Sequence, residues 1–347
     1  MIYKLILSLR DLHYRSGKHS TQAAVPTVCI GNITAGGTGK TPHVELTIKR
    51  LLTLGRSDIA VLSLGYGRRT KGFRYVETDN TPEQCGDEPL QIKRRFPILP
   101  VAVAKDRLDA CKRLADNEDA PAGIVVLDDA FQYRRLAPSL SVVLTPYNRP
   151  VSKDSLLPGG RLRDLKKRLY EPQTVIVTKC PYELDDLEKA DHAALLGFDS
   201  YDPATCTAVR KDKVQTLLFS RIMHGDPEPL FPEADKRYIY SGKAVLFSGI
   251  ADDTPLRDHL SDAHKIVAHK RFPDHHRFRR ADIRGLRRLM RRNPTAVFVT
   301  TEKDAQRLRS LANVPQELRE RMFYVPIQAA FLTPGEEAAY DNQLHRL

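Results

Sequence analysis

The stretch VPTVCIGNITAGGTGKTP, residues 25–42, decides the fold of this chain. The apolar residues Val25, Val28 and Ile30 predict a short buried strand, and a glycine-rich turn follows it. After Lys40 and Thr41, the apolar spacing over 43–52 predicts a helix. A strand, a glycine turn, Lys-Thr and a helix in this order are typical of a P-loop, which binds the phosphates of a nucleoside triphosphate.

Each part of the P-loop pattern has a chemical role. The backbone N–H groups of a glycine-rich turn can approach phosphate oxygens closely, and a helix N-terminus favours an anion. Lys40 would reach the terminal phosphates, and Thr41 would bind Mg²⁺ through its hydroxyl. The predicted nucleotide-binding residues are Thr34, Ala35, Gly36, Gly37, Thr38, Gly39, Lys40 and Thr41. Thr34 stands where the usual pattern has glycine, and an ordinary glycine turn before a helix is the alternative interpretation.

The composition limits the compartment and the partners. Five cysteines without C-x-x-C spacing favour a reducing compartment and free thiols over disulfides or zinc. A net charge of +12 suits either nucleic acid or an anionic membrane surface with a phosphorylated ligand. We find no run of 18 apolar residues and expect no spanning helix. Residues 1–16 predict a basic amphipathic helix, which either lies in a membrane interface or packs on the core.

Predicted strands and helices alternate along most of the chain. Strands are expected at 59–64, 98–104, 123–127, 141–145 and 174–178, and a further alternation begins at 243. This pattern predicts an α/β fold, with a doubly wound, mostly parallel sheet and a second, smaller α/β domain. We expect a P-loop domain with the N-terminal helix over 1–205, a linker over 206–240 and the C-terminal α/β domain over 241–347.

Two acids follow the apolar strand at 123–127. Asp128 and Asp129 would stand beside the P-loop, because the carboxyl ends of parallel strands meet at one edge of the sheet. One of them would bind Mg²⁺, directly or through water. The alternative is a solvated acidic pair. Two related P-loop classes fit poorly: Pro181 replaces the base-pairing aspartate of GTPases, and Ala35 replaces the extra lysine of ParA-type ATPases.

Seven motifs together resemble one family, the tetraacyldisaccharide 4'-kinases of lipid A biosynthesis. The motifs occur in that family's order: GNITAGGTGKTP (31–42), GYGR (65–68), GDEP (86–89), LDDAFQYRRL (127–136), LLPGGRLRD (156–164), FPDHH (272–276) and TEKDA (301–305). The resemblance implies transfer of the γ-phosphate of ATP to the 4'-hydroxyl of a lipid-linked disaccharide 1-phosphate, giving lipid IVA. It also implies a peripheral enzyme at the cytoplasmic face of the inner membrane of a Gram-negative bacterium. We expect a monomer that binds no nucleic acid.

The resemblance also assigns residues. Asp87 looks like the base that accepts the proton of the sugar hydroxyl, and His275 like the histidine that pairs with it. Glu88 matches an acid near the metal, and Gln132 matches a polar residue of the LDDAFQ motif. Arg163 matches an arginine suited to neutralising phosphate charge.

Some of these assignments have structural alternatives. Asp87 and Glu88, before a proline, could cap the helix that follows, and Thr301 could be an ordinary N-cap. Asp164 and Leu165 replace the family's Glu-Pro after Arg163, which leaves the role of that acid open. The rival function is a P-loop nucleotide switch or a nucleic-acid-stimulated ATPase, although no aromatic-rich basic patch supports it.

Overall fold

The computed structural model describes residues 2–15, 17–274 and 276–347. The helices are α1 Ile2–Arg15, α2 Lys40–Thr53, α3 Pro82–Cys85, α4 Asp87–Arg95, α5 Arg107–Ala115, α6 Asp186–Leu196, α7 Thr254–Ser261, α8 Arg280–Arg292, α9 Glu302–Arg309, α10 Gln316–Arg319 and α11 Pro334–Leu344. Short 3₁₀ turns lie at η1 Val151–Lys153, η2 Lys166–Tyr170 and η3 Lys236–Tyr240.

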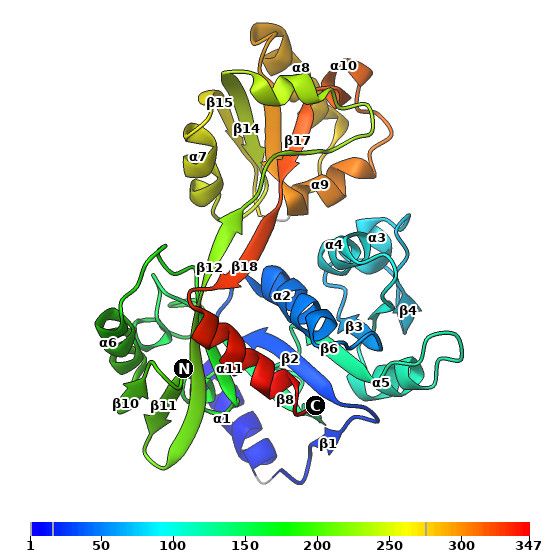
Figure 1. Ribbon diagram of the computed structural model, residues 1–347. Helices are drawn as coiled ribbons and strands as arrows, with labels where there is room; N and C mark the ends of the chain where they lie inside the picture. Colours follow the sequence, from blue (N-terminus) through cyan, green and yellow to red (C-terminus); the bar gives the residue numbers. More distant parts are fainter. Residues whose placement is uncertain (1, 16, 275) are drawn as a thin grey trace.

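The strands form two main sheets and a short pair (Figure 1). The large sheet contains β2 Thr27–Asn32, β3 Ile59–Ser63, β4 Arg74–Tyr75, β5 Val101–Val103, β6 Ile124–Asp128, β8 Leu140–Pro146, β9 Thr174–Thr178, β10 Ser200–Asp202, β11 Thr207–Arg210, β12 Lys213–His224 and β18 Ile327–Phe331. The second contains β13 Glu228–Pro229, β14 Lys243–Ser248, β15 Lys265–Arg271, β16 Val297–Thr301 and β17 Met322–Val325. Strands β1 Thr21–Gln22 and β7 Leu136–Ala137 pair with each other.

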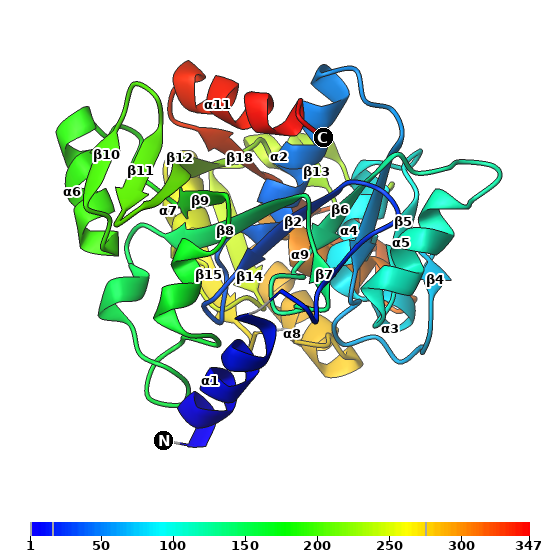
Figure 2. The same cartoon turned by 90° about the horizontal axis from the view of Figure 1, so that it is seen from below.

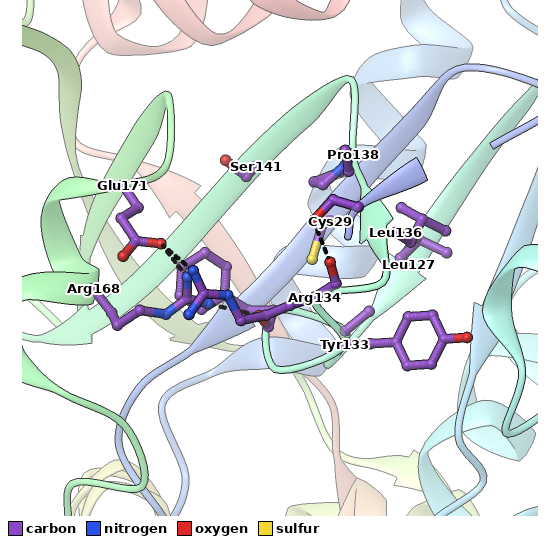
Figure 3. A pocket seen from close by; sticks show the side chains of 13 residues that line it. Cys29, Leu127, Tyr133, Arg134, Leu136, Pro138, Ser141, Arg168 and Glu171 are labelled. Carbon is purple, nitrogen blue, oxygen red and sulfur yellow. Dashed lines mark hydrogen bonds and ion pairs between the residues drawn. The ribbon is translucent and has the colours of Figure 1, made fainter. Parts of the chain in front are cut away.

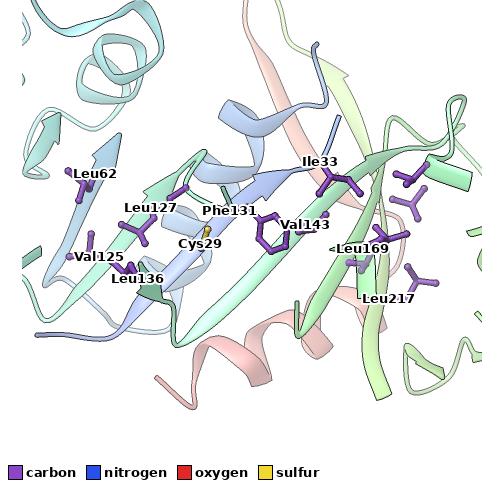
Figure 4. Packing of buried hydrophobic residues seen from close by; sticks show 14 of the residues in the cluster. Cys29, Ile33, Leu62, Val125, Leu127, Phe131, Leu136, Val143, Leu169 and Leu217 are labelled. Carbon is purple, nitrogen blue, oxygen red and sulfur yellow. The ribbon is translucent and has the colours of Figure 1, made fainter. Parts of the chain in front are cut away.

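The centre of the large sheet is parallel and runs in the order β12-β9-β8-β2-β6-β3-β5. The strands β9, β8, β2, β6, β3 and β5 are buried along their whole length, as expected for a sheet covered on both faces. Helix α2 packs on one face through Val44, Ile48 and Leu51. The opposite face is closed by a cluster around Phe131, with Cys29, Leu127 and Leu169 (Figure 4). These layers confirm the predicted α/β class.

The carboxyl ends of the central strands meet at one edge of the large sheet. Strand β2 ends at Asn32, β3 at Ser63, β6 at Asp128 and β9 at Thr178. Strand β2 lies between β6 and β8. The strands that follow β2 in the chain, β3, β5 and β6, lie on one side of it, and the later strands β8 and β9 lie on the other. Ligands of doubly wound sheets bind at such a switch point, and the P-loop is located there.

The strand pairing departs from the expected linker at 206–240. Strands β11 and β12 continue the large sheet, and β18 and α11 return to it after the second sheet. The far half of β12, Ser220–His224, pairs antiparallel with β18. These two strands form the ribbon between the two sheets in Figure 1. This return could not be predicted from the sequence, because a strand's partner is set by long-range packing and not by local pattern.

Candidate active site

The P-loop adopts the predicted strand–turn–helix geometry. Strand β2 ends at Asn32, and α2 begins at Lys40 with Gly39 as its N-cap. Gly36 and Gly39 have φ values of 100° and 85°, which glycine adopts at no steric cost. The first turn of α2 has no acidic residue and no side-chain cap. Its backbone N–H groups are therefore available to an anion, and the helix dipole favours one.

Hydrogen bonds from three other segments hold the P-loop. The Asn32 Nδ2 donates to the Thr38 Oγ1 at 2.6 Å, and the Thr178 Oγ1 donates to the Thr38 carbonyl at 2.9 Å. The Ala35 N–H donates to the Arg161 carbonyl at 2.7 Å. Thr34 is buried and forms a β-bridge with Leu162. The buried Thr34 thus takes part in a contact between two loops, at the position where a glycine is usual.

Several cations surround the exposed side of the P-loop. A Cβ atom placed on Gly36 would lie 3.8 Å from the Arg161 Nη1 and 4.0 Å from the Arg149 Nη2. Lys40 starts α2 and points toward Asp129, with its Nζ 3.8 Å from the Asp129 Oδ2. Guanidinium and ammonium groups around a helix N-terminus form a suitable site for a polyphosphate.

Asp129 is held by cations on both of its oxygens. The Arg163 Nη1 donates to the Asp129 Oδ2 at 3.0 Å, and its Nη2 donates to the Asp129 Oδ1. Burial alone would raise the pKa of Asp129, but Lys40 and Arg163 outweigh it and lower the pKa. Asp129 has a φ of 53°, an uncommon conformation for a residue other than glycine. Such strain often marks a functional site.

Asp128 has a different environment from its neighbour. It is buried at the end of β6, where the Ser63 Oγ donates to its Oδ2 at 3.0 Å. Among the described residues its Oδ1 has no hydrogen-bond partner. Burial, and then the charges of Glu88 and Asp129, raise the pKa of Asp128 to about 7. An unsatisfied buried carboxylate oxygen beside a P-loop fits a cation, which would satisfy that oxygen and favour the ionised form.

No group of three or more aspartate, glutamate, histidine or cysteine side chains within the described part of the chain is arranged to hold a metal ion. A P-loop Mg²⁺ site uses fewer protein ligands, because phosphates, a Thr hydroxyl and water complete its coordination. Thr41 and Asp128 belong to elements that meet at the same sheet edge, and they fit such a site.

Asp87 and Glu88 lie at the start of α4 and contact α9, a helix that belongs to the unit of the second sheet. The Arg307 guanidinium donates to the Asp87 Oδ2 through its Nε at 3.1 Å, and the Lys303 Nζ donates to the Glu88 Oε1 at 3.0 Å. Arg307 also donates to the Asp304 Oδ1 at 2.9 Å. Gly86 is the N-cap of α4 and no side chain caps this end, so the alternative that the two acids cap the helix is wrong. They lie in its first turn and join the two units of the chain.

Gln132 and His275 are the remaining predicted residues. The Gln132 Nε2 donates to the Asn32 carbonyl at 2.6 Å, which fixes the end of β2. His275 lies outside the described residues. Its neighbour His276 shares a hydrogen bond of 3.0 Å with Asp282 and stacks on Phe272.

Sequence reasoning missed the basic partners of this site. Lys303 lies in the TEKDA motif, where Thr301 is the N-cap of α9 as the structural alternative predicted, and Arg307 follows on the same helix. Their i, i+4 spacing places both cations on one face of the helix, which is a signal the sequence does contain. Arg149 and Arg161 come from loops whose position over the P-loop depends on tertiary contacts.

A cavity of about 190 Å³ lies away from the P-loop (Figure 3). It is lined by Cys29, Phe131, Arg134, Arg168 and Glu171 among others, and by none of residues 34–41. Its arginines are already paired, Arg134 with Asp11 and Arg168 with Glu171.

All five cysteines of the chain are buried and free, as predicted.

Helix α1 is amphipathic, and its apolar side faces outward. Asp11 is buried and pairs with Arg134 and Lys167, while the Tyr3 hydroxyl donates to the Arg163 carbonyl at 2.8 Å. The exposed apolar side chains are Leu5, Ile6, Leu9 and Leu12, which are 55–67% accessible. The side of α1 that packs on the protein is a narrow one that contains the buried Leu7 and Asp11. No helix among the described residues combines the length and hydropathy needed to cross a bilayer.

Comparison with known proteins agrees with this architecture. The family model of tetraacyldisaccharide-1-P 4'-kinase, LpxK, matches residues 1–346. A tetraacyldisaccharide 4'-kinase of Parabacteroides distasonis is 37% identical over 326 residues, covering 90% of this chain and 83% of the relative. One from Porphyromonas gingivalis is 38% identical over 335 residues, covering 92% and 87%.

A solved structure shares the fold. The crystal structure of LpxK from Aquifex aeolicus in complex with ATP superposes with a TM-score of 0.71 at 21% identity, covering 99% of this chain and 96% of that one. The family match over the whole chain and the relatives above 30% identity lead to one conclusion. This chain belongs to the tetraacyldisaccharide-1-P 4'-kinase family.

Proposed function

We propose that this chain transfers the γ-phosphate of ATP to the 4'-hydroxyl of tetraacyldisaccharide 1-phosphate, giving lipid IVA in lipid A biosynthesis. The observation that carries the proposal is the P-loop with an uncapped helix N-terminus, in a chain whose named relatives are tetraacyldisaccharide 4'-kinases. The rival function, a nucleotide switch or nucleic-acid-stimulated ATPase, is not favoured by that family membership.

The proposed nucleotide site consists of the P-loop and its cations. Backbone N–H groups of residues 36–41 bind the phosphate oxygens, and Lys40 reaches the terminal phosphates. Arg163 holds Asp129 and Lys40 approaches the same carboxylate, so the side chains are oriented before the nucleotide binds. Gln132 supports this arrangement because its side chain donates a hydrogen bond to the Asn32 carbonyl at the end of β2.

We also propose that Thr41 and Asp128 are the principal protein ligands of Mg²⁺. Asp129 is engaged by Arg163 on both oxygens, whereas Asp128 keeps an unpaired Oδ1, so Asp128 is the better candidate of the pair. Glu88 is near enough to raise the pKa of Asp128. Its carboxylate would therefore help to balance the positive charge of the ion. When bound, the ion supplies charge neutralisation for the phosphates.

Asp87 is the proposed general base for the acceptor hydroxyl. A sugar hydroxyl is a weak nucleophile, and a carboxylate that accepts its proton assists attack on the γ-phosphorus. The ion pair with Arg307 holds the Asp87 carboxylate in place at the start of α4. His275, from the segment before α8, would orient Asp87 as a positioning residue.

The site therefore draws on both units of the chain. We propose that the second unit comprises about residues 225–326, connected to the first through β12 and β18. We propose that the chain acts as a monomer. Closure of the two units would exclude water while the γ-phosphate is transferred.

We propose that α1 holds the enzyme on the cytoplasmic face of the inner membrane, where an acylated acceptor resides. The four exposed apolar side chains of α1 provide the surface that enters the interface, and neighbouring basic residues face anionic headgroups.

The direct test is transfer of label from ATP carrying a labelled γ-phosphate. The acceptor is tetraacyldisaccharide 1-phosphate in neutral detergent micelles with Mg²⁺, and Lys40→Ala is the control. We expect labelled lipid from the wild type and almost none from the variant. ATP hydrolysis that responds to nucleic acid but yields no labelled lipid would refute the proposal.

A further inference from the structure

Helix α8 and the segment before it carry an unusual concentration of arginine. Residues 277–292 contain eight arginines and one aspartate, a formal charge of +7 in a chain whose total is +12. The eight are Arg277, Arg279, Arg280, Arg284, Arg287, Arg288, Arg291 and Arg292. More than half of the net charge therefore lies in one short segment that the proposed catalytic residues do not include.

The arginines lie on the outer face of α8. Ile283, Leu286 and Met290 are buried in the core of the second unit, and their spacing defines the inner face of the helix. All eight arginines except Arg287 are exposed. Among the described residues, Arg287 is the one member that forms an ion pair, with Glu317 at 3.4 Å. The face is thus almost uncompensated by the protein's own acids.

Helix physics does not account for this arrangement. The C-terminal end of a helix favours cations, which explains Arg291 and Arg292. The N-terminal end disfavours cations in its first turn, where Arg280 is located. Arginines four residues apart, such as Arg284 and Arg288, also repel each other. An external anion that neutralises the face would remove both penalties.

The position of α8 indicates which kind of anion would neutralise its arginine face. Figure 2 shows α1 and α8 at the same edge of the molecule, at the bottom of the view. Figure 1 shows them in different units, near opposite ends of the long axis. A flat surface that meets the exposed apolar side of α1 can therefore also meet the arginines of α8. Stable attachment of a peripheral protein usually requires two such signals, one apolar and one basic.

We propose that the arginine face of α8 is a second membrane-contact surface, which binds anionic lipid headgroups while α1 inserts its apolar side chains. The inference rests on the proposed function only in so far as that function brings the enzyme to a membrane. With one contact in each unit, the membrane would restrain the orientation of the second unit relative to the first.

The test compares two variants with the same loss of charge. The first carries Arg284→Gln, Arg288→Gln, Arg291→Gln and Arg292→Gln. The matched control carries Lys112→Gln, Arg113→Gln, Lys211→Gln and Lys213→Gln, four exposed cations outside α8. Binding is measured by co-sedimentation with vesicles of phosphatidylcholine alone and of phosphatidylcholine with phosphatidylglycerol. Thermal unfolding of each variant verifies its fold.

We expect wild-type binding to require the anionic lipid and to weaken with salt. The α8 variant should lose affinity by roughly fivefold for each arginine that touches the surface, and by more than tenfold altogether. The control should lose much less. Equal losses in both variants, or no loss in the α8 variant, would overturn the proposal. So would loss of duplex DNA binding by the α8 variant with vesicle binding unchanged, since nucleic acid would then be the occupant.

The α8 variant should still transfer phosphate to acceptor in neutral micelles, where no anionic surface is present. Failure of the wild type in that assay would refute the proposed kinase function. The vesicle comparison would still decide the role of α8, so the two failures are distinguishable.

Discussion

Replacing Glu45 with glutamine should stabilise the protein at alkaline pH. Glu45 lies on α2, is 2% exposed, and faces the second unit. Its Oε1 accepts a hydrogen bond of 3.1 Å from the Gln91 Nε2, and the Arg95 Nε lies 4.0 Å from its Oε2. Glu302, at the start of α9, is the acid that acts on it most strongly. Lys49 on α2 completes the set of nearby charges.

The magnitude follows from the pKa of this carboxyl group. Burial, and then the charge of Glu302, raise the pKa of Glu45 from 4.5 to about 7. A group whose pKa is raised on folding contributes stability that is complete below its unfolded pKa and is lost as pH rises through its folded pKa. The loss for Glu45 therefore falls between about pH 4.5 and pH 7, and amounts to roughly 3 kcal/mol.

Glutamine keeps the shape of Glu45 and cannot ionise. We expect Glu45→Gln to have a higher Tm than the wild type at about pH 8 and a nearly equal one at about pH 4. A difference of about 3 kcal/mol corresponds to several degrees in a protein of this size. Differential scanning fluorimetry across this range measures the effect, with the exposed Glu118→Gln as the control. A Tm difference that is the same at both pH values would refute the reasoning.

Three further predictions concern the site and the membrane. Asp87→Asn should lower kcat by about 10²–10⁴-fold with little change in the KM for ATP, because a base acts mainly in the transition state; an equal fall in ATP affinity would argue for a nucleotide-binding role. Arg163→Lys retains the charge but cannot bind both oxygens of Asp129, so steady-state kinetics should show kcat/KM about tenfold lower; unchanged kinetics would contradict that role. Leu9→Gln with Leu12→Gln should weaken vesicle binding roughly tenfold for each leucine, from about 1.5 kcal/mol of apolar burial apiece; unchanged co-sedimentation would exclude insertion of α1.

The local features of the fold were predictable from the sequence. The predicted strand and helix around the P-loop correspond to β2 and α2, and the strand predicted at 174–178 coincides with β9. These elements have strong apolar periodicity, and glycine or proline marks their ends. Helix α4 is harder to predict from the sequence, because its nine residues are rich in charge and its burial depends on contacts with α2 and α9.

The parts of the site that depend on one local stretch of sequence were predictable, and the contacts between distant segments and between the two units were not. Asp128 and Asp129 follow a buried strand, so their place at the sheet edge followed from topology. Their different environments did not, because Ser63 and Arg163 reach them from distant segments. The contact of Arg307 with Asp87 spans 220 positions in sequence, and no local pattern encodes it.

The measurement that tests the central claim most directly is identification of the product. Wild-type enzyme is incubated with ATP, Mg²⁺ and tetraacyldisaccharide 1-phosphate, and the lipid is then isolated and analysed by mass spectrometry and phosphorus NMR. The account predicts a gain of one phosphate, as a new monoester at the 4' carbon, and its absence with Lys40→Ala and Asp87→Asn. Phosphate at another position, or consumption of ATP with the lipid unchanged, would contradict it.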